Sequence, residues 1–382
     1  MFKKTLIAVA ALGALAGTAT AADVTVYGRI DTGLRYQNVD YDVQGADDKS
    51  SFEMVSGNNA GSRFGLKGGE DLGNGMKLSF VLENGFDGDD GSFDSNGDRM
   101  FGREASLSLE GGFGKIGFGR MGILNSTAGS YAIGQFTPFG TGWGAVGDQT
   151  LIFGASFSTR YSNMISYQTP DFAGFKVHAQ YSFGETNEDK TEVEGKTTTN
   201  RYYALGATYK NGGLNLIGIV DSVNESHKAT DAEEPDDTIR VTLGGSYDFG
   251  VVKPYVAAAY FKDAKVKTWL DSFAGEGDTV AGGRLAGDWD GYGIALGATA
   301  PLVGGTLYTT LGYMDAEEQD VPDSADLTRW TFGVGYQYPL SKRTYVYGDA
   351  GYFKDDFDYA TKASKDVKPE GYQAAVGLVH MF

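Results

Sequence analysis

Apolar and polar side chains alternate along most of this chain, and the alternation limits its fold more than any other feature. The residues from 24 to 35 follow the pattern, which returns at 238–249, 329–337 and 372–382. Successive side chains of an extended strand point to opposite faces, so each segment has one apolar face and one polar face. The pattern predicts an all-β protein built from many such strands.

The connections between these segments are alternately short and long. Short ones rich in Gly, Asp, Asn or Pro occur at 69–75, 110–114, 169–174, 210–213, 300–305 and 338–344, and long acidic ones at 40–53, 87–98, 185–194, 221–237 and 315–326. A soluble β-sandwich also has alternating strands. Short turns at one rim and long loops at the other are typical of an outer-membrane barrel instead. We therefore expect a transmembrane antiparallel β-barrel of about sixteen strands, an even number that pairs the first strand with the last.

The first 21 residues have the layout of a cleavable secretory signal. Lys3 and Lys4 precede an apolar stretch at 6–16, and small residues follow at 19–21. The apolar stretch is too short to span a membrane readily, so it is predicted to act as a targeting signal. We expect residues 22–382 to form one barrel domain that ends on an outward-facing aromatic residue, Phe382.

The composition disfavours several classes of function. The chain has 50 Asp and Glu against 32 Lys and Arg, a formal net charge of -18, which disfavours nucleic-acid binding. It has no cysteine, so a disulfide framework and a thiolate metal site are both impossible, and we expect no cofactor. The 57 Gly, 23 Tyr and 23 Phe are the residues that build tight turns and aromatic girdles.

Several motifs lie along the predicted strands, and together they are specific. They occupy 23–31, 62–68, 70–75, 112–120, 160–167, 170–175 and 376–382. Through them the chain resembles the general porins of Gram-negative outer membranes over its whole length after the leader. The resemblance implies a homotrimer of sixteen-stranded barrels in the outer membrane, in contact with its lipid and lipopolysaccharide. It also implies a pore for small hydrophilic solutes and ions, narrowed by an inward-folded third loop, and a terminal strand that the barrel-assembly machinery reads at Phe382.

Arginines on the polar faces are the candidate pore residues. By the alternation Arg29, Arg63 and Arg160 point into the lumen, because a charge at the bilayer midplane would cost about 2 to 4 kcal/mol. The resemblance places these three and Arg103 in a basic wall, although simple alternation puts Arg103 on the outer face. Secondary lumen candidates are Arg35, Lys67, Arg120, Arg240 and Arg329, of which Arg120 also has outer-face parity. The alternative is that the arginines only pair with carboxylates and stabilise the barrel.

The segment 122–159 is too long for a hairpin turn and resembles the constriction loop. It carries Pro138, Phe139, Gly140 and Trp143, and Asp148 is its only acidic residue. A basic wall facing a nearly neutral loop leaves a positive field, so we expect a weak preference for anions. The loop aromatics either pack the loop against the wall or stack on sugar rings in a solute-specific channel.

Other motifs were weighed against simpler structural explanations. The segment 112–117 fits G-x-G-x-x-G, but a strand follows it, so it is predicted to be a tight turn. The segment 94–98 has the D-x-N-x-D spacing that begins a calcium loop, but the glycine and glutamate of such a loop are missing. We therefore expect the acidic loops to be solvated. The alternative is that divalent cations bridge them to lipid phosphates. No nucleophile motif accompanies any of the three histidines, His178, His227 and His380, so no enzymatic activity is expected. A barrel-based surface enzyme or an adhesin is the less favoured alternative.

Overall fold

The structure is a computed structural model that describes residues 24–42, 48–93, 99–187, 190–226, 236–268, 287–321, 324–359 and 367–382. The predicted secretory signal, the segment 94–98 and His227 lie outside the described residues. Within the described ranges no helix has the length and apolar character of a helical membrane span.

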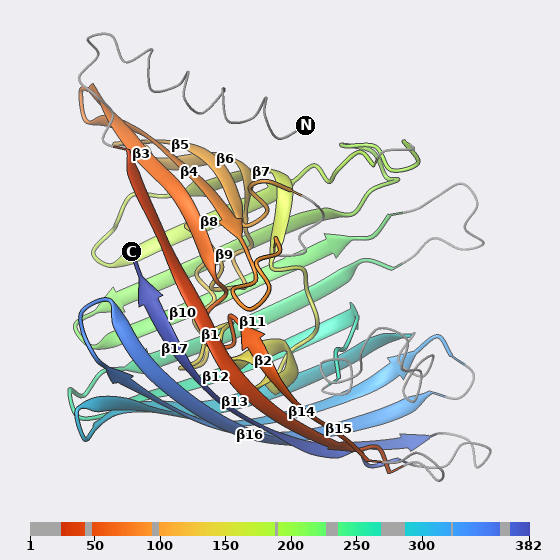
Figure 1. Cartoon of the computed structure of the whole chain (residues 1–382). Helices are drawn as coiled ribbons and strands as arrows, with labels where there is room; N and C mark the ends of the chain where they lie inside the picture. The colour runs from red at the N-terminus through yellow and green to blue at the C-terminus, as the bar shows by residue number, and fades with distance from the viewer. Residues whose placement is uncertain are drawn as a thin grey trace.

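In the described ranges seventeen antiparallel strands form one closed sheet (Figure 1). The first nine are β1 (Thr25–Asp40), β2 (Lys49–Ser56), β3 (Arg63–Gly73), β4 (Met76–Gly85), β5 (Glu104–Gly111), β6 (Gly114–Gly122), β7 (Arg160–Gln168), β8 (Phe175–Ser182) and β9 (Arg201–Asn211). The others are β10 (Leu214–Asn224), β11 (Thr238–Tyr247), β12 (Lys253–Ala264), β13 (Asp288–Leu302), β14 (Gly305–Gln319), β15 (Ala325–Pro339), β16 (Thr344–Tyr359) and β17 (Glu370–Met381).

The sheet closes because β1 pairs with β17, from Arg29 opposite Met381 to Asp40 opposite Glu370. On its other edge β1 pairs with both β2 and β3, which together occupy one place in the barrel. The barrel therefore has sixteen strand positions, and the prediction of about sixteen antiparallel strands is confirmed. The first and last strands are thus joined, as a closed membrane barrel requires.

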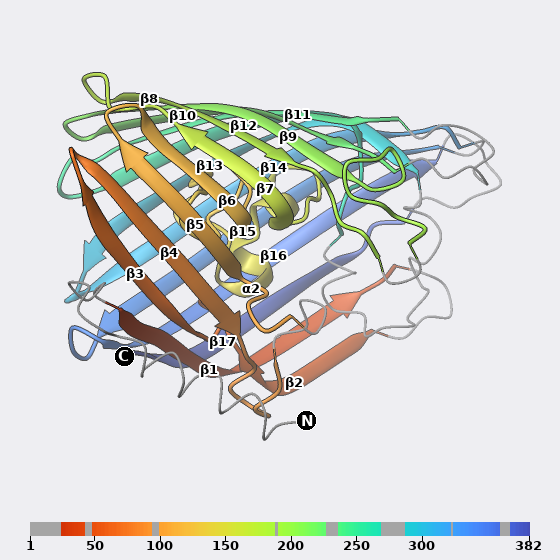
Figure 2. The same cartoon turned by 90° about the horizontal axis from the view of Figure 1, so that it is seen from above.

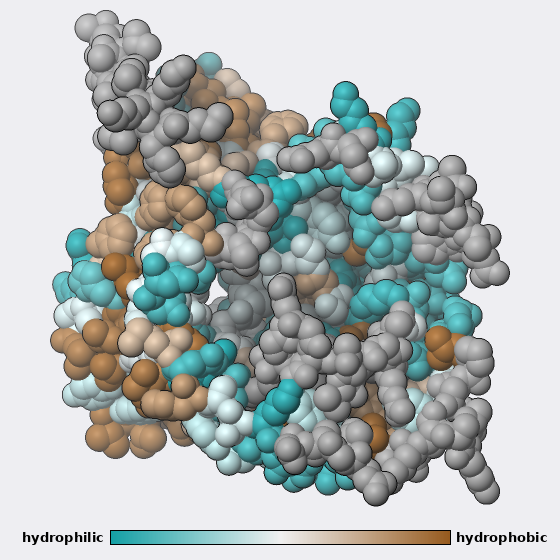
Figure 3. Space-filling view, turned by 45° about the vertical axis from the view of Figure 1, so that its right-hand side comes forward, coloured by the Kyte–Doolittle hydropathy of each residue, from teal (hydrophilic) through white to brown (hydrophobic). Residues whose placement is uncertain are grey.

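Alternating exposure along each strand separates an apolar outer face from a polar inner one. On β1 the outer residues Val26, Ile30 and Leu34 are exposed, whereas Asp31 and Gln37 on the opposite face of the strand are buried inside the barrel. Figure 3 shows hydrophobic residues over much of the left-hand flank and an opening near the centre that hydrophilic residues border. The outer face is therefore suited to lipid and the inner face to water.

The barrel wall is low on one side and high on the other. Strands β5 to β8 have only 8 or 9 residues each, whereas β13 to β16 have 15 or 16. At a rise of about 3.3 Å per residue and a tilt of about 40°, the low wall spans only about 21 Å along the barrel axis. The two sides therefore meet different surroundings.

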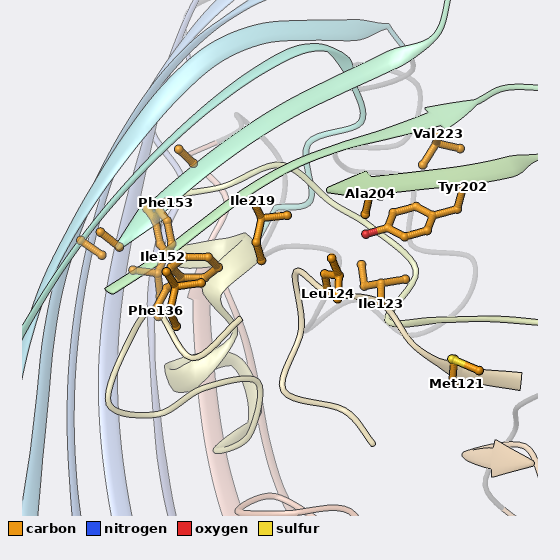
Figure 4. Close-up of a cluster of buried hydrophobic side chains, with 14 of the residues drawn as sticks. Met121, Ile123, Leu124, Phe136, Ile152, Phe153, Tyr202, Ala204, Ile219 and Val223 are labelled. Carbon is orange, nitrogen blue, oxygen red and sulfur yellow. The ribbon is translucent and has the colours of Figure 1, made fainter. Parts of the chain in front are cut away.

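Residues between β6 and β7 fill part of the interior, which a sheet alone leaves open. They include two short helices, α2 (Gly144–Gly147) and α3 (Gln149–Ile152), and Figure 2 shows α2 enclosed by the strands. Phe136, Ile152 and Phe153 are fully buried against the inner faces of β10 to β14 (Figure 4). The hydrophobic core of this protein thus lies between a loop and the wall.

Candidate functional site in the barrel lumen

Residues 123–159, here called the pore loop, connect β6 to β7 and lie inside the barrel. The Ile123 amide donates to the Thr159 carbonyl at 3.1 Å, which closes the base of the loop. Glu104 on β5 accepts hydrogen bonds from the Ser130 amide at 2.9 Å and from the Ser130 hydroxyl at 3.1 Å. The first part of the pore loop is therefore fixed to the low wall.

Aromatic residues fix the middle of the pore loop to the opposite, high wall. The ring of Trp143 lies 5.0 Å from Tyr308 and 5.7 Å from Tyr347, and Phe139 packs edge-on against Trp143 at 5.5 Å. Phe139, Trp143 and Tyr347 are almost wholly buried, and Tyr308 is partly buried. These contacts favour the packing interpretation of the loop aromatics over the stacking of sugars.

Pro138 and Gly140, which the sequence also singled out in the pore loop, lie where the loop needs a close contact or an unusual backbone conformation. Pro138 touches Gly297 on β13, where a Cβ atom would lie 2.5 Å from the Pro138 Cδ atom. Only glycine leaves room for the proline there. Gly140 has a φ of 66°, in the left-handed region that glycine adopts without strain.

Residues 57–62, here called the inward segment, interrupt the strand between β2 and β3 and project toward the pore loop. Asp31 holds this segment: its Oδ2 atom accepts from the amides of Asn59 and Ala60, both at 2.8 Å, and its Oδ1 atom accepts from the Tyr347 hydroxyl at 2.9 Å. The Asn59 carbonyl in turn accepts from the Trp143 amide at 3.1 Å. The inward segment therefore joins the wall to the pore loop.

A cavity of about 770 Å³ lies beside the pore loop and the inward segment. Its cationic lining residues are Arg29, Arg35, Arg63, Arg103, Arg160 and Lys267. Asp148 is the only carboxylate residue among the described residues that line it. The four arginines predicted to form the basic wall are thus brought together around one cavity, as are Phe139, Trp143 and Asp148 of the pore loop.

One carboxylate serves two of these arginines. Oε1 of Glu83 lies 2.9 Å from Nε of Arg103 and 3.6 Å from Nη1 of Arg63, and its other oxygen accepts from the Tyr27 hydroxyl at 2.9 Å. Arg29, by contrast, forms no ion pair or hydrogen bond with any residue that the structure describes. The lining therefore carries more positive than negative charge.

Lys267 was not predicted from the sequence. It follows β12, and its ammonium lies 3.4 Å from Oδ2 of Asp148. The Lys267 carbonyl accepts from the Arg329 guanidinium at 2.8 Å, so a buried arginine on β15 positions the lysine. No local pattern marks Lys267 as a lumen residue, because a loop contact between distant segments brings it there.

Two secondary candidates face inward but do not line the cavity. Arg240 is 3% exposed and its Nη2 atom lies 2.7 Å from Asp221, while Arg329 is wholly buried at 2.6 Å from Asp355. Pairing satisfies their charges, since a buried ion requires a partner. Arg240 and Arg329 therefore do not border the cavity, contrary to the expectation from the sequence. They pair with carboxylates, which is the alternative that the sequence left open for the arginines.

The other secondary candidates differ among themselves. Arg35 lines the cavity and pairs with Glu53 at 2.7 Å. Lys67 lies over the ring of Tyr27, at 4.8 Å from the centroid, toward the rim with the short turns. Arg120 donates to the Gly102 carbonyl at 2.7 Å and does not line the cavity. Arg120 therefore lies apart from the arginines that surround this cavity.

Irregular backbone explains where simple alternation was wrong. Arg103 precedes β5, so the parity of that strand does not apply to it, and it turns inward to Glu83. The register between β6 and β7 shifts at Gly119, whose φ is 122°, and this bulge redirects Arg120. Asn163, with a φ of 50°, breaks the pattern of β7, so that Tyr161 stacks inward on Tyr202 at 5.2 Å instead of facing outward.

Comparison with known proteins agrees with this geometry. Residues 8–358 match the family model of Gram-negative porins. The chain belongs to this family. The porin is 36% identical to an outer membrane porin protein of Bordetella pertussis and 31% identical to outer membrane porin protein 32 of Delftia acidovorans, each alignment covering both chains completely.

Solved structures give the same answer for the fold. An anion-selective porin from Comamonas acidovorans superposes with a TM-score of 0.64 at 27% identity, covering 95% of this porin and 100% of the other chain. OmpF of Salmonella typhi, at 17% identity and a TM-score of 0.57, shares the fold over 94% of this porin. The porin is thus a water-filled outer-membrane channel for passive diffusion in a Gram-negative bacterium, and its short-turn rim is the periplasmic one.

Proposed function

We propose that this porin favours anions, and that the cationic lining of the 770 Å³ cavity controls this preference. The observation that carries the proposal is the imbalance of charge: six cationic residues line the cavity and one carboxylate residue faces them. Glu53, Glu83 and Asp148 each pair with cations of the lining. The six cationic lining residues outnumber these three carboxylates by three.

The expected preference is modest. A unit charge about 8 Å from the pore axis changes the energy of a monovalent ion by about 0.5 kcal/mol in water. Three such charges stabilise a monovalent anion by about 1.5 kcal/mol, which raises its concentration in the lumen roughly tenfold before screening by salt. The acidic outer loops oppose this only weakly, because exposed charges are screened over about 8 to 10 Å.

The name of one structural relative supports the same direction. The Comamonas acidovorans porin, 27% identical, is described as anion-selective. Diffusion through such a pore requires only a wetted path with polar walls, so a catalytic group is not needed. The buried packing of Phe139 and Trp143 gives no support to a sugar-specific channel.

The low wall supports a homotrimer as the assembled form. Strands β5 to β8 span about 21 Å, which is less than the apolar band of about 25 Å that lipid requires. Outer residues such as Leu107, Phe118 and Ile165 remain exposed on this wall of the single chain. Neighbouring subunits would cover these residues better than lipid does. An OmpT of Vibrio cholerae, related in fold, has been described in a trimer form.

Further partners follow from the two ends of the barrel. Phe382 exchanges hydrogen bonds with Gly28 at 3.1 Å and its ring lies over that glycine, which makes the terminal strand a suitable signal for the barrel-assembly machinery.

At the long-loop rim Glu317 stands opposite both Asp290 and Asp326. Like charges so close are costly unless cations bridge them, which fits contact with lipopolysaccharide phosphates through divalent cations.

The experiment is a zero-current potential in a planar bilayer under a potassium chloride gradient. We expect the sign of an anion-selective pore. Arg29→Gln should reduce the anion preference about threefold, since it removes one unpaired charge, whereas Arg343→Gln, in a short turn outside the cavity, should leave it unchanged. A cation-signed potential in the unmodified porin would refute the proposal.

A further inference from the structure

A second recess of about 410 Å³ lies on the periplasmic side of the pore loop. Strands β7 to β10 and the turn at 169–174 form its wall, and the pore loop forms its roof. Thr127 and Gln135 line both this recess and the cavity of the arginines. A solute that leaves the arginine cavity therefore meets the recess next on its way to the periplasm.

Two lysines from neighbouring strands face this recess. Lys176 on β8 stands directly opposite Thr208 on β9, and Lys210 lies two residues farther along β9. Diagonal neighbours of this kind are about 7 to 8 Å apart, a distance that two long side chains readily close around one ligand. Lys176 and Lys210 together form a two-cation site on the inner wall.

These cations are only weakly compensated. The one acidic residue that lines the recess, among those the structure describes, is Asp171 in the exposed turn, at 3.9 Å from Lys176. Lys210 has no ion pair with any described residue. The recess thus has a spare positive charge that no structural role explains.

Neutral polar groups between the lysines supply further contacts. The Thr208 hydroxyl lies 3.1 Å from the His178 ring, which fixes both side chains, and Gln168 stands opposite His178 on β7. Hydroxyl and amide groups donate hydrogen bonds to the oxygens of an anion while ammonium groups compensate its charge. Two cations with donors between them suit a doubly charged oxyanion better than chloride.

We infer that the recess around Lys176 and Lys210 is a binding site for small doubly charged oxyanions, with hydrogen phosphate as the probe. The inference rests on the proposed anion preference and extends it, because it adds a second anion-binding site on the periplasmic side of the arginines. The site retains a divalent anion while chloride passes.

The test is the block of chloride current when potassium phosphate is added on the periplasmic side of single channels. We expect a concentration-dependent block in the unmodified porin. The double variant Lys176→Gln, Lys210→Gln should need about tenfold more phosphate for half-block. Lys67→Gln removes an inner-face lysine of the same rim on another wall, and it should change the half-blocking concentration by less than about twofold.

Each result separates the two proposals. A cation-signed zero-current potential refutes the anion preference, whatever phosphate does. An anion-signed potential with no phosphate block, or with a block equal in the double variant, overturns only the recess. A block that Arg29→Gln weakens and the double variant does not would likewise overturn it, by assigning the phosphate to the arginine cavity. Equal conductances of all variants at 1 M salt, where screening acts over about 3 Å, show that each has folded.

Discussion

The ammonium of Lys267 lies 3.4 Å from Oδ2 of Asp148, so a lysine after β12 covers the single carboxylate of the pore loop. Oδ1 of Asp148 meanwhile accepts from the Thr150 amide at 3.0 Å at the start of α3. The carboxylate therefore has a structural role at the helix and an electrical partner in the lumen. Its negative charge contributes little field at the place where a solute passes.

Removing either member of this pair should change selectivity in opposite directions. Lys267→Gln exposes the charge of Asp148 and should lower the anion preference about threefold, whereas Asp148→Asn should raise it by a similar factor. Zero-current potentials measure both. Lys265→Gln is the matched control, because Lys265 pairs with Asp288 at 2.6 Å and does not line the cavity. A shift of equal size in the control would exclude this explanation.

Glu83 offers a substitution with two separable effects. Glu83→Gln removes the carboxylate that Arg63 and Arg103 share, so the anion preference should rise about threefold. Because it removes the carboxylate partner of the buried Arg103 and the partly buried Arg63, the free energy of unfolding should fall by about 3 to 5 kcal/mol. Urea titration of the refolded porin and its zero-current potential report the two effects. Glu110→Gln, at the exposed end of β5, should alter neither.

The buried pair of Arg329 and Asp355 should dominate stability. Arg329→Met leaves Asp355 buried and uncompensated, so unfolding should become easier by about 3 to 5 kcal/mol. The exposed pair of Lys354 and Glu370 serves for comparison, and Lys354→Met should cost less than about 1 kcal/mol. If the two variants unfolded at the same denaturant concentration, the buried pair would not be more stabilising than the exposed one.

Asp31 should control how steadily the channel stays open. Asp31→Ala removes the acceptor of the Asn59 and Ala60 amides, and each unpaired amide costs about 1 to 3 kcal/mol. The inward segment then keeps its side-chain bonds to Asp349 and Tyr345 but loses the acceptor that fixes its backbone, so it supports Trp143 of the pore loop less firmly. We expect more current noise and brief closures in single-channel records. Asp40→Ala, at the exposed end of β1, should leave the records unchanged.

Salt concentration should alter selectivity without any mutation. Screening acts over about 10 Å at 0.1 M salt and over about 3 Å at 1 M. The field of the arginines therefore reaches the pore axis only at low salt, and the anion preference should decrease steadily as the salt concentration is raised. Gradients of equal ratio at both concentrations measure the change. A preference that does not depend on salt would assign selectivity to direct binding instead of a field.

The sequence by itself determined the barrel. Period-two alternation is a local property, since each residue faces opposite to its neighbours, and on β1 it correctly placed Val26 outside and Arg29 inside. Alternately short and long connections then fixed the number of hairpins. The same reasoning recognised the pore loop as a long segment with one carboxylate, Asp148.

Only the tertiary structure decided which charges border the lumen. Arg240 and Arg329 have the parity of lumen residues, yet loops cover them, while Lys267 enters the cavity from a loop that has no periodic pattern. The bulge at Gly119 redirects Arg120. These positions depend on contacts between segments far apart in the chain and on irregular backbone, and neither leaves a local signal, because alternation reports the face of a strand and not what lies above it.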